Sequence, residues 1–127
     1  MIAQDIMTHT VFTIHPEASV QEAAQLIDQK RISGLPVVDG NNNLIGIVTS
    51  ADIISKVNRE GLLVSDIMSS QLRTVTVDTE VDEIAALLTD GKIKRVPVVK
   101  DGKLVGIVSR TDIVHAVAKG HLIIRPW

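Results

Sequence analysis

The chain contains nearly the same sequence twice, and the second copy follows the first at an almost constant spacing. Two segments recur 61 positions later, namely Asp5-Ile6-Met7 as Asp66-Ile67-Met68 and Leu35-Pro36-Val37-Val38 as Val96-Pro97-Val98-Val99. A third recurs after 60 positions, because the first copy has one extra residue in its turn: Leu44–Val48 returns as Leu104–Val108. A tandem repeat implies one supersecondary unit per copy. We therefore predict two similar units packed by pseudo-two-fold symmetry, with two related sites in the cleft between them.

Length and composition limit how these units can fold. The chain has 127 residues, and one copy of roughly 60 residues would bury too little surface to be more than marginally stable alone. We expect the two copies to fold together. Hydrophobic residues make up 45% of the chain but aromatic residues only 2%, so the core is expected to consist of Val, Ile, Leu and Ala.

The overall charge and the missing residue types exclude several classes of function. A net charge of −2 and a pI near 6.0 give no general attraction to nucleic acid or to an anionic membrane. The absence of cysteine excludes disulfides, thiol catalysis and thiolate metal sites. Neither a signal peptide nor an apolar run of the roughly 18 residues that span a bilayer is found. We expect a cytoplasmic protein, and because the first repeat begins almost at Met1, no further domain.

Each copy follows the same order of expected elements. An extended stretch (11–14 or 72–75) precedes an amphipathic helix, which in the first copy starts with a predicted Ser19-x-x-Glu22 capping box. Two β-branched runs separated by a Gly/Asn or Asp-Gly turn then predict a hairpin. A second helix is expected over 51–57 and again over 111–118. Each unit therefore reads strand–helix–strand–strand–helix.

Taken together, these motifs resemble a tandem pair of CBS domains, a family named after cystathionine β-synthase. The resemblance runs from Ala3 to Ala118. It implies an α/β fold of two β-α-β-β-α repeats, with the first repeat over 1–58, a linker over 59–64, the second repeat over 65–119 and a short tail over 120–127. It also implies a regulatory module without catalytic residues. Such modules bind adenosine-containing ligands, such as AMP, ADP, ATP or S-adenosylmethionine, in the cleft between the repeats.

The step from the second hairpin strand into the second helix carries the first candidate site. It reads Thr49-x-x-Asp52 in one copy and Ser109-Arg110-x-Asp112 in the other. By itself this pattern is a helix capping box. The resemblance implies a second role, in which each Asp accepts hydrogen bonds from the ribose hydroxyls while Thr49, Ser109 and Arg110 face the phosphate. Both interpretations stay open at this point.

The resemblance also implies an adenine pocket. The matching positions are Thr13, Ile14, Gly34, Leu35 and Pro36 in the first copy and Thr74, Val75, Arg95, Val96 and Pro97 in the second. There the backbone before the proline would bind the adenine edge, and apolar side chains would flank the ring. The alternative is plain strand entry, where a proline is tolerated because its missing N–H is not needed.

Basic residues distinguish the two copies. The second has Lys92, Lys94 and Arg95 before its hairpin and Arg110 within the strand–helix step, where the first has Ser50. Since arginine suits bidentate phosphate contacts, we expect the second-repeat site to be better equipped for phosphate. Lys92 and Lys94 are further phosphate candidates.

No metal site or catalytic motif is expected. The four histidines do not pair at ligand spacing, and neither a nucleophile elbow nor a glycine-rich phosphate loop occurs. Any Mg²⁺ would arrive with a nucleotide. The leading hypothesis is a ligand-sensing regulator that forms a homodimer and acts on a target protein. The alternative is a ligand-free protein–protein interaction or dimerisation module.

Overall fold

The computed structural model describes residues 1–9, 11–91 and 93–122. The chain forms two compact units that do not simply follow the order of the repeats. The first-repeat unit comprises Phe12–Leu72, whereas the second-repeat unit combines Met1–Val11 with Arg73–Trp127. The opening segment of the chain thus packs with the second copy, and the Asp66-Ile67-Met68 segment that opens the second copy packs with the first.

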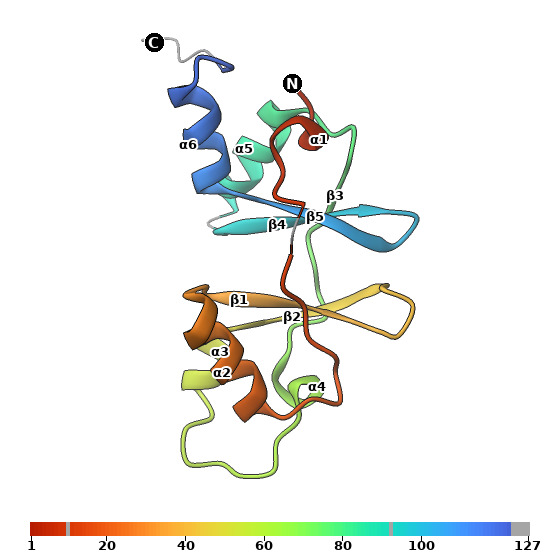
Figure 1. Ribbon diagram of the computed structural model, residues 1–127, viewed down its shortest axis with the longest axis vertical. Helices are drawn as coiled ribbons and strands as arrows, with labels where there is room; N and C mark the ends of the chain where they lie inside the picture. The colour runs from red at the N-terminus through yellow and green to blue at the C-terminus, as the bar shows by residue number, and fades with distance from the viewer. Residues whose placement is uncertain (10, 92, 123–127) are drawn as a thin grey trace. The chain divides into compact units, whose positions relative to one another are not determined.

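The first-repeat unit is built on an antiparallel hairpin of β1 (Gly34–Val38) and β2 (Leu44–Thr49). Its helices α2 (Val20–Lys30), α3 (Ser50–Ile54) and α4 (Val64–Ile67) lie on one face of this hairpin (Figure 1). Single-residue bridges widen the hairpin, because Ile14 pairs with Val37 in parallel and Ser69 pairs with Ile47. The buried core is aliphatic: Ile14, Ala23, Leu35, Val37, Val48, Val64 and Ile67.

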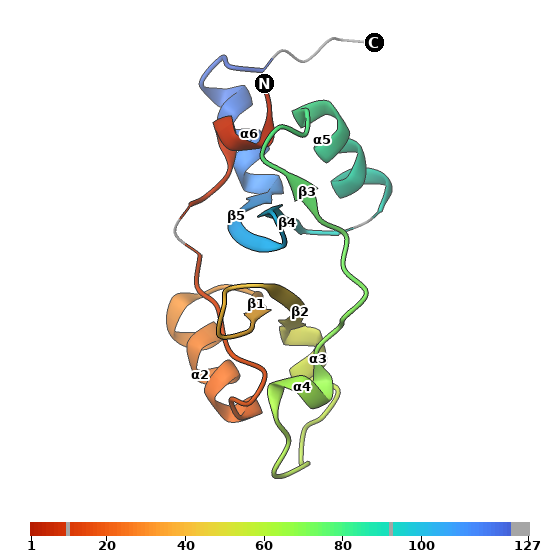
Figure 2. The same ribbon diagram turned by 90° about the vertical axis from the view of Figure 1, so that its right-hand side faces the viewer.

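The second-repeat unit repeats this plan. A sheet in the order β3-β4-β5 joins β3 (Val75–Thr76), parallel to β4 (Arg95–Lys100), with the antiparallel β5 (Lys103–Ser109). Figure 2 shows α1 (Ala3–Ile6), α5 (Val81–Asp90) and α6 (Arg110–Ala118) on one face of that sheet. Its buried core consists of Ala3, Met7, Val75, Ile84, Leu88, Val96, Val98 and Val108. The aliphatic cores predicted from composition are confirmed.

Three local expectations need correction. The helix expected over 51–57 is α3, Ser50–Ile54, because it ends in i→i+3 turns and Asn58 then adopts a positive φ of 72°. The extended stretch over 11–14 forms only the Ile14 bridge among the described residues. Only half of the predicted capping box forms in the described part of the chain, since the Ser19 hydroxyl accepts from the Glu22 amide without the reciprocal bond.

A methionine and a glycine lock each opening segment onto its sheet. The Met7 side chain lies against Gly106 of β5, where an added Cβ would meet the Met7 Sδ at 2.6 Å and the Thr8 carbonyl oxygen at 3.0 Å. Met68 lies against Gly46 of β2 in the same way, with a corresponding sulfur distance of 2.6 Å. The Asp-Ile-Met motif of each sequence copy therefore packs against the Gly-Ile-Val strand of the other copy.

We predict that Gly106→Ala destabilises the protein. The new methyl group would clash with the Met7 sulfur and, less avoidably, with the Thr8 backbone, so the free energy of unfolding should fall by about 1–3 kcal/mol. Urea denaturation measures this. Gly40→Ala is the control, because no atom lies within 4 Å of its added Cβ, and its effect should stay within about 0.5 kcal/mol. Equal stabilities of the two variants would contradict the contact.

Candidate functional site

The strand–helix step of the first-repeat unit places three candidate residues together. Gly34 at the start of β1 lies opposite Thr49 at the end of β2. The Ser50 amide donates to the Ser33 carbonyl oxygen at 2.9 Å, which holds the backbone before β1 beside the first turn of α3. Asp52, in that turn, therefore lies close to the entry of β1.

The second-repeat unit builds the same step from different side chains. Arg95 lies opposite Ser109, and the Arg110 amide donates to the Lys94 carbonyl oxygen at 3.3 Å. Asp112, in the first turn of α6, thus occupies the place that Asp52 has in the first-repeat unit. The two candidate sites are equivalent in backbone and differ in the side chains around them.

Both aspartates close a complete capping box. In α3 the Asp52 Oδ2 accepts from the Thr49 amide at 2.8 Å and from the Thr49 hydroxyl at 3.0 Å, while the Asp52 amide donates to Thr49 Oγ1 at 3.3 Å. Ser109 and Asp112 make the same three bonds at 2.8, 3.0 and 3.3 Å. The capping interpretation is confirmed in both units. The box uses only Oδ2, so a role of Oδ1 in binding ribose is compatible with it and stays a prediction.

The two carboxylates differ at the second oxygen. The Thr8 hydroxyl donates to Asp112 Oδ1 at 3.1 Å. At the matching position of the first-repeat unit, Ser69 makes no such bond to Asp52 within residues 1–9, 11–91 and 93–122. Sequence reasoning missed Thr8, which is 104 positions from Asp112. The only signal was its place directly after the Asp-Ile-Met motif.

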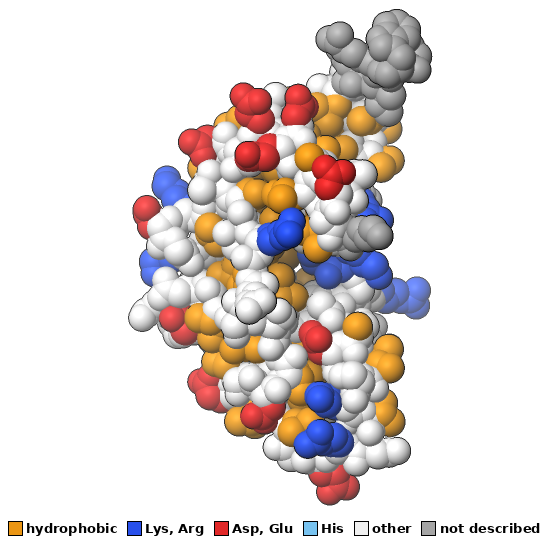
Figure 3. Space-filling view, turned by 180° about the vertical axis from the view of Figure 1, so that it is seen from behind, with side chains coloured by type: hydrophobic (Ala, Val, Ile, Leu, Met, Phe, Trp, Pro, Cys, Tyr) orange, Lys and Arg blue, Asp and Glu red, His pale blue; other side chains and the backbone are white. Residues whose placement is uncertain are grey.

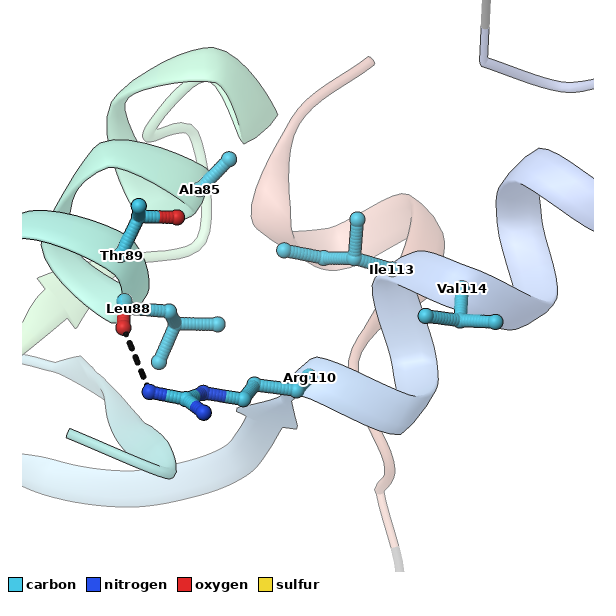
Figure 4. Close-up of a pocket in the computed structure, with 6 residues that line it drawn as sticks. All are labelled: Ala85, Leu88, Thr89, Arg110, Ile113 and Val114. Carbon is cyan, nitrogen blue, oxygen red and sulfur yellow. Dashed lines mark hydrogen bonds between the residues drawn. The ribbon is translucent and has the colours of Figure 1, made fainter. Parts of the chain in front are cut away.

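Arg110 links two helices of the second-repeat unit. Its Nη2 group donates to the Leu88 carbonyl oxygen at 3.0 Å (Figure 4). Its Nε–H donates to the Ile93 carbonyl oxygen at 3.3 Å. Leu88 is in the last turn of α5, where the helix dipole favours a positive charge. The guanidinium thus connects the end of α5 to the start of α6. A phosphate contact, as predicted from the sequence, would use the remaining N–H groups.

A groove between α5 and α6 adjoins this arginine. It has a volume of about 350 Å³ and is lined by Ala85, Leu88, Thr89, Arg110, Ile113 and Val114 (Figure 4). Apart from Thr89 and Arg110 its lining is aliphatic, and Val114 is 66% exposed. This groove offers an apolar surface within the second-repeat unit.

The candidate adenine-pocket residues gather around the first strand of each hairpin. Ile14 pairs with Val37, next to Gly34, Leu35 and Pro36, and Val75 pairs with Val98, next to Arg95, Val96 and Pro97. Thr13 and Thr74 directly precede the paired residues. Leu35 and Val96 are fully buried in their aliphatic cores. A ligand contact in these strands would therefore fall to the backbone and to the threonines.

The basic candidates are placed unevenly. Lys94 is exposed and Arg95 half-buried, and burial lowers the pKa of the Arg95 guanidinium from its ordinary value. The guanidinium nevertheless stays charged near neutral pH, because arginine is effectively always protonated. Lys92, the remaining phosphate candidate, lies outside the described residues.

The described residues show no group of three or more His, Asp or Glu side chains placed to hold a metal ion. His15 has a structural contact instead, with Nδ1 lying 3.1 Å from the Val38 carbonyl oxygen. None of the helices in the described ranges is long and apolar enough to cross a bilayer.

The fold and the paired strand–helix steps define a tandem-repeat α/β module with one candidate ligand site per repeat. The sequence profile of the CBS domain matches residues 3–59 and 64–119. The chain therefore belongs to the CBS domain family, and it contains two such domains. This confirms the resemblance and the fold class predicted from the sequence.

Similar proteins carry this pair as part of a longer chain. The chain is 34% identical over 113 residues to L-aspartate semialdehyde sulfurtransferase of Methanocaldococcus jannaschii, covering 88% of this chain and 22% of that protein. It is 38% identical over 105 residues to inosine-5′-monophosphate dehydrogenase of Staphylococcus aureus, covering 80% of this chain and 21% of the enzyme. The chain thus spans about a fifth of the length of these two relatives.

Solved structures of CBS pairs resemble the whole chain. The structure of CBSX2 in complex with AMP has a TM-score of 0.89 and 32% identity, covering 95% of this chain and 98% of that one. The CBS domain pair of protein MJ0100, in complex with 5′-methylthioadenosine and S-adenosyl-L-methionine, has a TM-score of 0.84 and 32% identity, covering 94% and 98%. Both of these neighbours bind a molecule that contains adenosine.

We predict that Ser109→Ala lowers the free energy of unfolding by about 1 kcal/mol, since it removes the hydroxyl that accepts from the Asp112 amide and caps α6. Thermal or urea denaturation without ligand measures the loss. Ser70→Ala is the matched control. Ser70 is exposed and its side chain makes no hydrogen bond within the described residues. A loss at Ser70 as large as at Ser109 would contradict the capping role.

Proposed function

We propose that the chain is a regulatory module that binds an adenosine-containing ligand at the strand–helix step of each repeat. Asp52 and Asp112 accept the ribose hydroxyls, and the backbone at the entry of β1 and β4 contacts the adenine. The observation that carries this proposal is the Oδ1 atom that each complete capping box leaves unused. An ionised carboxylate oxygen in that position suits a ribose hydroxyl.

The ligands of similar structures support the same class of molecule. AMP in one neighbour and 5′-methylthioadenosine with S-adenosyl-L-methionine in the other share the adenosine group. The second-repeat site, with Lys94 directly before β4 and Arg95 at its start, carries positive charge suited to a phosphate, and Mg²⁺ would enter only with a nucleotide. Binding would regulate a target protein by favouring one of two conformations, which requires a ligand affinity that differs between them.

A dimerisation module without a ligand is the second candidate function. It is favoured by exposed apolar side chains on or just after the helix that follows each hairpin. Ile54, which ends α3, is 69% exposed, Val57, which lies just beyond α3, is 67% exposed, and Val114 of α6 is 66% exposed. Hydrophobic side chains also reach the surface elsewhere, as Figure 3 shows for one face. The two functions can coexist. A ligand-dependent rise in melting temperature distinguishes them, because a bound ligand stabilises the fold by RT ln(1 + [L]/Kd).

We predict that Asp112→Asn weakens AMP binding at the second-repeat site by roughly 10- to 100-fold. A hydrogen bond to a charged acceptor contributes about 1.5–3 kcal/mol, and the amide replaces one acceptor oxygen with a donor. Asp52→Asn should act in the same way on the first-repeat site. Isothermal calorimetry measures both. If affinity stays unchanged while the melting temperature drops by several degrees, the aspartates are helix caps only and the proposed function fails.

We also predict a homodimer in solution. The α5–α6 groove, with the exposed Val114 in its lining, presents an apolar surface that a closed two-fold dimer would bury. Light scattering or centrifugation at micromolar concentration should give twice the 13.7 kDa chain mass. Val114→Glu should shift the mass toward one chain, whereas Gln71→Glu adds the same charge at an exposed polar residue and should leave it unchanged. A wild-type mass of one chain would rule out the dimer.

A further inference from the structure

The two aspartates do not offer the same number of acceptor positions. An ionised carboxylate has about four. Two are used in Asp52, both on Oδ2 and both by Thr49. Three are used in Asp112, because the Thr8 hydroxyl adds a bond to Oδ1. Among residues 1–9, 11–91 and 93–122, Asp52 therefore keeps two acceptor positions open and Asp112 keeps one.

This difference affects the binding of a ribose, whose 2′- and 3′-hydroxyls can donate to one carboxylate as a pair. Asp52 can accept both hydroxyls on Oδ1. Asp112 can accept both hydroxyls only after the Thr8 hydroxyl stops donating to Oδ1. Binding the second ribose hydroxyl then replaces the Thr8 hydrogen bond and adds none. Since the net value of a typical hydrogen bond corresponds to a few-fold to tenfold in affinity, this exchange is large enough to rank the two sites.

Thr8 cannot simply move away from Asp112. Its amide donates to the Ile107 carbonyl oxygen at 2.8 Å, and its carbonyl accepts from the Ile107 amide at 3.1 Å. The preceding Met7 is buried and lies against Gly106. The Thr8 backbone is thus fixed to β5. The Thr8 hydroxyl can leave Asp112 Oδ1 only if the Thr8 side chain rotates.

We propose that Thr8 sets the ribose affinity of the second-repeat site, so that the first-repeat site, built on Asp52, binds a ribosyl ligand more tightly. This inference rests on the proposed function, since it assumes that both aspartates accept ribose hydroxyls. The basic residues of the second copy favour the second-repeat site for phosphate. For the ribose group, the proposal instead gives the first-repeat site the higher affinity. Thr8 acts through Asp112 and is a positioning residue.

The test uses adenosine, which has the ribose but no phosphate. An Asp52→Asn background isolates the second-repeat site, and there Thr8→Val keeps the shape of the side chain but removes the hydroxyl. Adenosine affinity measured by calorimetry should rise about 3- to 10-fold. Thr8→Ser, which retains the hydroxyl, should bind as the background does. The matched control is Ser69→Ala in an Asp112→Asn background, which should leave affinity unchanged because the described structure has no hydrogen bond between Ser69 and Asp52.

A second probe separates this role from a structural one. With 3′-deoxyadenosine, which lacks one hydroxyl, the single open position of Asp112 suffices, so the gain from Thr8→Val should disappear. A merely structural effect of Thr8 would change the binding of both probes alike, and that result would overturn the proposal.

A third comparison leaves Thr8 intact, in case the valine variant folds poorly. Asp112→Asn, which leaves the first-repeat site, should bind adenosine about 3- to 10-fold more tightly than Asp52→Asn. Equal affinities, or an unchanged affinity in Thr8→Val, would overturn the proposal while the proposed function stands. Absence of adenosine binding to the wild-type chain at millimolar concentration would reject both.

Discussion

The packing of each opening segment onto the other repeat's hairpin is the contact on which the rest of the structure depends. Met7 fills the space above Gly106, and Thr8 then pairs with Ile107; Met68, Gly46, Ser69 and Ile47 do the same in the first-repeat unit. Only a glycine lets the methionine approach so closely. Neither compact unit therefore coincides with one sequence repeat. The first-repeat unit, Phe12–Leu72, includes the Asp-Ile-Met segment of the second copy, and the second-repeat unit uses Met1–Val11 from the start of the chain.

The packing of Met7 on Gly106 also places the opening segment beside the candidate site of the second-repeat unit. The backbone that carries Met7 also carries Thr8, whose hydroxyl reaches Asp112. In the first-repeat unit the equivalent backbone carries Ser69, and Asp52 lacks that bond in the described part of the chain. Two sites with the same backbone thus differ in chemistry through a residue outside the strand–helix step. Under the proposed function, ligand binding at Asp112 would depend on Thr8 of the opening segment, whereas binding at Asp52 would not depend on Ser69.

Capping and binding are compatible in these aspartates because a carboxylate has two oxygens. Oδ2 closes the box with the Thr49 or Ser109 backbone and hydroxyl, which orients the side chain before any ligand arrives. Such preorganisation lowers the entropic cost of binding.

Arg110, by contrast, uses its side chain mainly for a structural contact. Its bonds to the Leu88 and Ile93 carbonyl oxygens make it first a link between helices, although its residue type suggested a phosphate ligand.

The sequence by itself determined the repeat, the hairpin of each unit with a helix before and after it, the aliphatic cores and the capping boxes of α3 and α6, because these depend on residues close together in the chain or on periodic patterns. The end of α3 was misjudged, since Val57 continues the apolar pattern while Asn58 adopts a left-handed backbone conformation. Only the tertiary structure decided that Met7 packs on Gly106 and that Thr8 reaches Asp112. Those pairs lie about a hundred residues apart, and no local pattern specifies which copy's segment completes which sheet.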